Sequence, residues 1–109
     1  MAAIELKIRD KKDKEKISKT YEADGYDLML GTIDDFFEII DIDKLDDEKA
    51  VGLMIIKAYP QIKAILRDVF PELTDAEYRC VKVNDLITTI MQIGASALEN
   101  IGFMTDEKN

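Results

Sequence analysis

The stretch from residue 69 to residue 93, VFPELTDAEYRCVKVNDLITTIMQI, constrains the fold more than any other because it contains two helix starts. Thr74 and Glu77 have the spacing of a capping box, in which a hydroxyl and a carboxylate each accept a backbone amide hydrogen at the helix start. Leu73 and Tyr78 flank this box at the spacing of a hydrophobic staple. A helix that begins at this box is therefore predicted.

Two other residue types sharpen these boundaries. Pro71 suits the first turn of a helix, because it lacks the amide hydrogen that a helix start leaves unpaired. The second start is predicted at Asn84 or Asp85, both of which are favourable N-cap residues. The apolar residues that follow recur with helical spacing and predict a last helix over about residues 85–100, ended by Gly102.

Helical periodicity also covers two regions nearer the N-terminus, residues 26–40 and residues 46–70. Pro60 lies inside the second region and disfavours helix at Tyr59, so we expect either a kink or two abutting helices there. The expected core is formed by the apolar stripes of all the predicted helices: Leu28, Ile33, Phe36, Phe37, Val51, Met54, Ile55, Ile62, Ile65, Leu66, Val69, Phe70, Tyr78, Leu86, Ile90 and Ile93.

The first part of the chain has a different period. Ile4, Leu6 and Ile8 alternate with charged residues, which is typical of a half-buried strand. The polar run DKKDKEK follows, and residues 17–23 then resume a composition that favours strands. These two segments predict a β-hairpin, which must pack on the helices or pair elsewhere because an isolated hairpin is marginal in water.

The predicted fold class is therefore mainly α, with four to five helices in a compact bundle and a small N-terminal β-hairpin. A chain of 109 residues fits one domain. We expect this single domain to span residues 1–102, with the hairpin in 1–22 and the helical part in 24–102. Residues 103–109 are predicted to form a flexible C-terminal tail.

Composition excludes several classes of function. The net charge of −8 disfavours a nucleic-acid partner, and no apolar run is long enough to cross a bilayer. The single Cys80 cannot form an internal disulfide, so a cytoplasmic protein is expected. Residues 24–48 contain ten acids and one base, Lys44. This run is either a solvated face or an acidic surface that docks a basic partner.

The search for catalytic and metal sites is negative. The chain has no histidine and no glycine-rich phosphate loop, which removes the common nucleophilic triads and most zinc sites. Residues 41–48, DIDKLDDE, begin like a calcium loop, but Leu45 and Gly52 occupy positions that need oxygen ligands. Adjacent acids on a helix point about 100° apart, so no converging carboxylate pair is predicted. We expect no enzyme activity, metal or cofactor.

Two groups of residues are candidates for partner binding. Asp34, Asp35 and Glu38 lie within the acidic run and would form an acidic docking face on a helix. Gly94 and Ala97 belong to a run of small residues that flattens one turn of the last helix, so that another backbone could approach closely. That backbone is either a neighbouring helix of the same core or a partner.

The chain resembles the small tail assembly chaperones of long-tailed bacteriophages and prophages. The resemblance lies in Phe-Pro-x-Leu-Thr-x-x-Glu-Tyr at residues 70–78 and Val-Lys-Val-x-Asp-Leu-Ile at residues 81–87. It extends to β-forming phrases at residues 4–8 and 19–22 and to the acidic helical middle, and covers about residues 4–98. The shared positions are mainly caps and apolar phases rather than a catalytic signature.

This resemblance implies a function. Such proteins bind the long, helical, aggregation-prone tape measure protein, keep it soluble in the host cytoplasm, and help tail-tube subunits polymerise around it. They are not retained in the finished virion. The tape measure and tail-tube proteins would be the partners, and a homo-oligomer is expected.

Other classes of function are also compatible with the sequence. A small acidic regulatory or inhibitory module encoded by a prophage, including a DNA mimic, would use the acids of residues 24–48 to occupy a basic site on a host enzyme. A helical structural protein that simply oligomerises is another possibility. An enzyme would require carboxylates that converge from separate helices.

Overall fold

The computed structural model describes the backbone of residues 3–106 and the side chains of residues 3–101. Two antiparallel strands come first and helices follow. The strands are β1 (Ala3–Arg9) and β2 (Ile17–Asp24), and the helices are α1 (Leu30–Ile39), α2 (Glu48–Lys57), α3 (Tyr59–Val69), α4 (Asp75–Tyr78) and α5 (Val83–Asp106). Short 3₁₀ turns, η1 (Gly25–Asp27) and η2 (Ile42–Lys44), flank α1. The chain is thus mainly helical with an N-terminal hairpin, as predicted.

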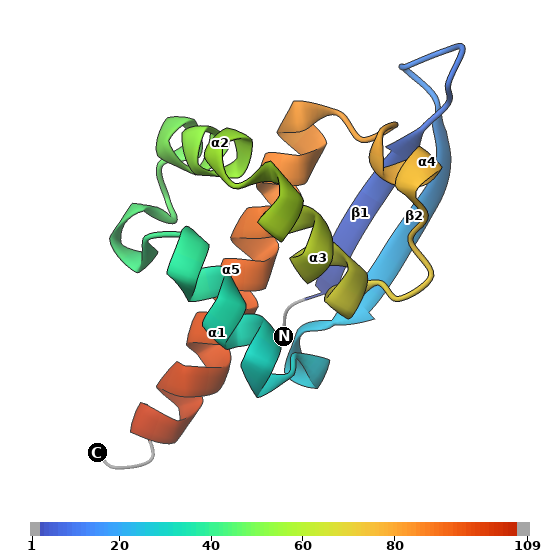
Figure 1. Cartoon of the computed structure of the whole chain (residues 1–109). Helices are drawn as coiled ribbons and strands as arrows, with labels where there is room; N and C mark the ends of the chain where they lie inside the picture. The colour runs from blue at the N-terminus through green and yellow to red at the C-terminus, as the bar shows by residue number, and fades with distance from the viewer. Residues whose placement is uncertain (1–2, 107–109) are drawn as a thin grey trace.

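The long helix α5 organises the molecule (Figure 1). It packs against β1 along one side and against α2 along another, and α1 packs on α3. In Figure 1, α1, α2 and α3 lie in front of α5, whereas the hairpin lies beside it with α4 next to the strands. The helices therefore form a layer in front of α5 and the hairpin.

The hairpin places one face in the core. Ile4, Leu6 and Ile8 are all buried, which confirms the alternation predicted for β1. The outer edge of β1 is occupied by side chains of α5: the Glu5 amide donates to Oε1 of Gln92 at 2.9 Å. This contact satisfies a backbone group that an open strand edge would leave available for pairing.

The break at Pro60 is confirmed. Only Ala58 separates α2 from α3, and Pro60 lies in the first turn of α3, where the missing amide hydrogen has no helical acceptor. The chain resumes helix at once, so the apolar phase continues across the break. As a result, Ile55 of α2 and Ile62 of α3 both enter the core.

The capping box at the start of α4 is also confirmed. The Glu77 amide donates to Oγ1 of Thr74 at 3.1 Å, and the Thr74 amide donates to Oε1 of Glu77 at 3.0 Å. Leu73 and Tyr78 on either side of the box are buried. Pro71 was expected in the first turn of a helix, but it lies in the turn that precedes Thr74. The helix begins only after Thr74, its N-cap residue.

Both predicted ends of α5 are wrong. The helix begins at Val83, where the Lys82 carbonyl accepts its first helical bond, so Asn84 and Asp85 lie in the first turn and not at the cap. At the other end the helix passes through Gly102 and continues to Asp106. A glycine ends a helix when its φ turns positive, and no described glycine has a positive φ. The rest of the predicted tail, residues 107–109, lies outside the described residues.

Most of the predicted core is buried. Leu28, Ile33, Phe37, Met54 and Val69 are only half-buried, and all but Ile33 pack against the edge of the core cluster. Six hydrophobic residues outside the predicted list are buried as well: Ile4, Leu6, Ile8, Ile40, Leu73 and Ala97. The hairpin and the helices thus contribute to one cluster. Among the described helices, none combines the length and apolar content that a bilayer crossing requires.

Candidate functional site

The acidic candidates lie together on α1. Carboxylate oxygens of Asp34, Asp35 and Glu38 all lie within 4.8 Å of one another, and all three residues are exposed. The expectation that adjacent acids diverge is wrong for Asp34 and Asp35, because side-chain rotation brings their carboxylates together although their Cβ atoms point apart. An exposed cluster of this kind is common without a metal. The arrangement concentrates negative charge at one place on the surface.

Two hollows border this acidic cluster. Glu38 contributes to a hollow of about 460 Å³ formed by residues 37–42 at the end of α1. Asp35 and Glu38 also line a groove of about 250 Å³ between α1 and α3, together with Ile39, Gln61, Ala64 and Ile65. The acidic cluster is therefore adjacent to concave surface that contains apolar side chains.

Large apolar side chains are exposed on the same helical layer. Leu53 and Ile56 of α2 are 55% and 68% exposed, and Tyr59 at the start of α3 is 48% exposed. We call these three residues the apolar stripe. Leu53 and Ile56 are three residues apart and lie on one face of α2, whereas Tyr59 follows the break at Ala58 and its ring centroid lies 5.2 Å from that of Tyr78. Leu30 at the start of α1 is 82% exposed. Grouped apolar exposure of this kind is typical of protein-binding surfaces.

Part of the acidic run has a structural role. Asp41 accepts from the amide of Asp43 and caps η2, and Asp47 accepts from the amides of Lys49 and Ala50 and caps α2. These aspartates stabilise the starts of helical turns through the usual N-cap bond. Asp24 caps η1 in the same way, by accepting from the Tyr26 amide. The acids of residues 24–48 are consequently not equivalent, and Asp34, Asp35 and Glu38 are among those that make no such bond within the described chain.

The Leu45 side chain packs against Gly94, one of the small residues of α5. Gly94 and Ala97 are both buried. A Cβ atom added at Gly94 would lie 2.6 Å from Cδ2 of Leu45, which follows η2. The turn flattened by Gly94 therefore accommodates a loop side chain, and neither residue is presented to a partner in this structure.

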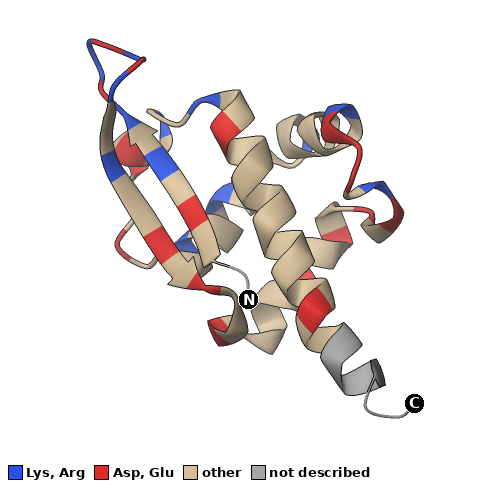
Figure 2. Cartoon of the chain, turned by 180° about the vertical axis from the view of Figure 1, so that it is seen from behind, with Lys and Arg blue, Asp and Glu red and all other residues tan. Residues whose placement is uncertain are grey.

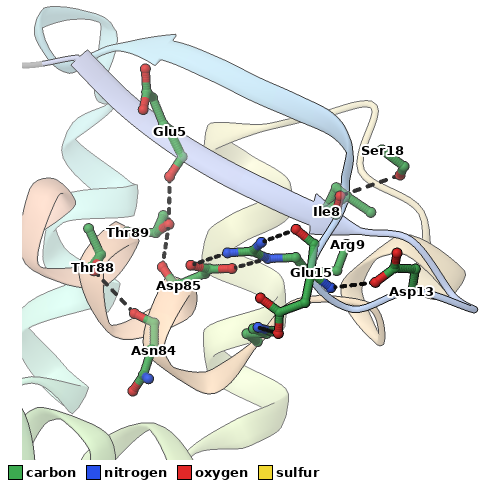
Figure 3. A network of polar contacts seen from close by, with 11 residues as sticks. Glu5, Ile8, Arg9, Asp13, Glu15, Ser18, Asn84, Asp85, Thr88 and Thr89 are labelled. Atoms are coloured by element: carbon green, nitrogen blue, oxygen red, sulfur yellow. Dashed lines mark hydrogen bonds and ion pairs between the residues drawn. The ribbon is translucent and has the colours of Figure 1, made fainter.

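The start of α5 is joined to the hairpin by polar contacts (Figure 3). Arg9 donates to both carboxylate oxygens of Asp85, at 2.8 and 3.2 Å, and its Nη1 lies 3.5 Å from the Glu15 carbonyl oxygen. The Thr89 hydroxyl donates to the Glu5 carbonyl oxygen at 2.5 Å. These contacts hold the hairpin turn over the α4–α5 connection.

A second set of contacts joins β2 to α4. Glu77, besides its role in the capping box, accepts from the Tyr21 hydroxyl at 2.5 Å and lies 3.4 Å from Nζ of Lys19. The hydrogen bond from Tyr21, followed by the bonds from Thr74 and Lys19, lowers the pKa of Glu77 to about 2. Glu77 therefore stays ionised at any pH near neutrality.

A basic cavity lies between the hairpin turn and the α4–α5 connection. Its volume is about 500 Å³, and its lining includes Arg9, Lys11, Lys14, Arg79 and Lys82. Figure 2 shows basic and acidic residues interspersed at this hairpin turn, whereas α5 beside the hairpin carries few charges. Sequence patterns missed this site because its side chains come from segments about 70 residues apart.

No protein-family model, curated protein or solved structure matches this chain. Function is therefore inferred from the sequence pattern and from the surface of the chain itself.

Proposed function

We propose that this chain is a tail assembly chaperone that binds the tape measure protein of a long-tailed phage and keeps it soluble before tail-tube subunits assemble around it. The sequence resemblance over about residues 4–98 supplies the identity of the partner. Exposed apolar side chains on α2 and an acidic, hollowed surface on α1, both in the layer of helices in front of α5, support a protein-binding role.

The chemistry of this surface matches an amphipathic helix with a basic face. Leu53, Ile56 and Tyr59 would cover apolar residues of the partner, removing them from water and from self-association. Asp34, Asp35 and Glu38 would face its basic residues and increase the rate of encounter. The net charge of −8 would keep the complex soluble by repulsion between copies.

Co-expression tests this proposal directly. The tape measure protein from the same gene cluster is expected to shift from the insoluble to the soluble fraction when this chain is co-expressed, and the two should co-purify. Failure of the chain to co-purify with any tail protein of that cluster would remove the chaperone role and favour the acidic regulatory module.

Charge reversal separates docking from general solubility. The variant with Asp34→Lys, Asp35→Lys and Glu38→Lys should lose capture of the tape measure protein. The matched control reverses three exposed acids elsewhere, Glu22, Asp27 and Glu72, and changes the net charge equally. If both variants lose capture to the same extent, or if neither does at low salt, the cluster on α1 only solubilises the chain.

The apolar stripe has its own test. The double substitution Leu53→Ser and Ile56→Ser removes exposed apolar area without opening the core, so the fold should persist by circular dichroism. We expect the soluble fraction of the tape measure protein to fall to the level seen without the chaperone. Unchanged solubilisation would show that the stripe is not the binding surface.

A further inference from the structure

The basic cavity is distinct from the surface used in the proposed function. It lies beside the hairpin turn, whereas the acidic cluster lies on α1 at the other end of the molecule in Figure 1. The volume of about 500 Å³ falls in the range of ligand-binding sites.

The charge of the cavity opposes that of the whole chain. Its lining contains five bases and one acid, Asp10, in a protein whose net charge is −8. Arg9 and Lys82 have intramolecular partners, Asp85 and Glu15, the latter at 3.6 Å. The other three, Lys11, Lys14 and Arg79, form no ion pair with any described residue. These three cations are available to an anionic ligand.

The start of α5 adds to the positive potential of the cavity. Val83, its first residue, lines the cavity, and Lys82 at the cap position has no side-chain oxygen that could accept an amide hydrogen. Within the described residues, no side chain accepts from the backbone amides of Val83 and Asn84. Unpaired amides at the start of a long helix favour a negative charge nearby.

The rest of the lining is aliphatic or weakly polar. Ala76, Cys80, Val81 and Val83 provide this surface, and Val83 is 63% exposed. No aromatic side chain is among the described lining residues, so a nucleotide base would find no stacking partner. A ligand with a few carboxylates next to an aliphatic group fits both parts of the lining.

We propose that this cavity binds an acidic peptide segment of a partner protein. Glutamate or aspartate carboxylates of that segment pair with Lys11, Lys14 and Arg79, and an aliphatic side chain next to them packs on Val81 and Val83. The inference does not rest on the chaperone function, because it uses different residues and a ligand of opposite charge.

Fluorescence anisotropy with the full chain tests the proposal. The probe is a fluorescein-labelled peptide of about ten residues that alternates glutamate and leucine, a length that spans such a site. Its matched control replaces every glutamate by glutamine. We expect saturable binding of the glutamate peptide that weakens as salt rises, and none of the glutamine peptide. Equal binding of both peptides would overturn anion recognition.

Matched charge reversals localise the binding. The variant with Lys14→Glu and Arg79→Glu should bind the glutamate peptide about tenfold more weakly or worse, because two contacts become repulsive. The variant with Lys49→Glu and Lys57→Glu changes the net charge equally at exposed positions outside the cavity and should stay within about twofold of the parent. Circular dichroism verifies that both variants fold. Equal losses in both variants would overturn the assignment to this cavity.

Cys80 provides a readout that is independent of affinity. It is the single cysteine of the chain and lines the cavity. Saturating glutamate peptide should slow its alkylation by iodoacetamide, a neutral reagent whose approach does not depend on charge, whereas the glutamine peptide should not. An unchanged alkylation rate at saturation would show that the peptide binds elsewhere.

Discussion

Two ends of the molecule are held together in different ways. At the hairpin end, residues 3–24 with 74–92, polar side chains join segments far apart in sequence, as in the pairs Arg9–Asp85 and Tyr21–Glu77. At the acidic end, residues 30–57, the aspartate caps bond amides only two or three residues away. The acidic end is therefore joined to the rest of the chain chiefly by apolar burial.

This difference separates fixed geometry from open apolar surface. Hydrogen bonds and ion pairs between distant segments, such as Arg9 with Asp85, fix the hairpin turn relative to the start of α5 (Figure 3). At the acidic end, large apolar side chains such as Leu53 and Ile56 stay exposed and leave apolar area for a partner to cover. The proposed docking of a helical partner uses this end.

The largest expected effect is the loss of an apolar anchor at the acidic end. Phe36 of α1 is completely buried, so Phe36→Ala should reduce the free energy of unfolding by roughly 3–5 kcal/mol, measured by urea denaturation. Phe37 is only half-buried, and Phe37→Ala should cost less. A loss below about 1 kcal/mol for Phe36→Ala would show that burial is not what secures this end.

The second-largest loss of stability is expected when the ion pair between Arg9 and Asp85 at the hairpin end is removed. Arg9→Met leaves the Asp85 carboxylate without its partner in a place where its side chain is only 14% exposed, which is unfavourable for a charged group. We expect a lower midpoint of thermal unfolding than for Lys7→Met, a neighbouring change on β1 that removes no ion pair seen in the described residues. Equal midpoints would remove the distinction between the two ends.

A smaller effect is expected where the acidic end meets α5. Gly94→Ala would crowd the Leu45 side chain, and such overpacking lowers the free energy of unfolding by about 1–3 kcal/mol. The higher helix propensity of alanine offsets about 1 kcal/mol of this loss. Gly94→Ala should therefore be mildly destabilising in the parent. In a Leu45→Ala background it should become neutral or stabilising, as measured by urea denaturation. The same effect in both backgrounds would contradict this contact.

The smallest effect concerns pH. The pKa of Glu77 falls from its ordinary 4.5 to about 2 because Tyr21 donates a hydrogen bond to the ionised carboxylate. A lowered folded-state pKa gives stability that is present above pH 4.5 and is lost as the pH falls towards 2. Thermal unfolding of Glu77→Gln should depend less on pH over this window. Glu72→Gln, an exposed neighbour, should keep the pH dependence of the parent.

Local chemistry explains what could be predicted from the sequence. The alternation in β1, the capping box at Thr74 and the break at Pro60 each depend on residues within a few positions of one another, and all three are present. Asp34, Asp35 and Glu38 were also named together from the sequence, and residues three and four positions apart do share a helix face. The approach of the adjacent Asp34 and Asp35 carboxylates was not predicted. The role of this acidic cluster in binding stays a prediction.

Contacts between segments far apart in the sequence could not be predicted, because no local pattern links the residues that make them. Leu45 fills the space beside Gly94, and Arg9 pairs with Asp85, only because the folded chain brings these segments together. The same holds for the basic cavity, in which Lys11 and Lys14 of the hairpin turn meet Arg79 and Lys82 from about 70 residues further along the chain. A glycine at position 102 predicted the end of the last helix, but the backbone there stays helical. A glycine permits the left-handed conformation that ends a helix but does not impose it.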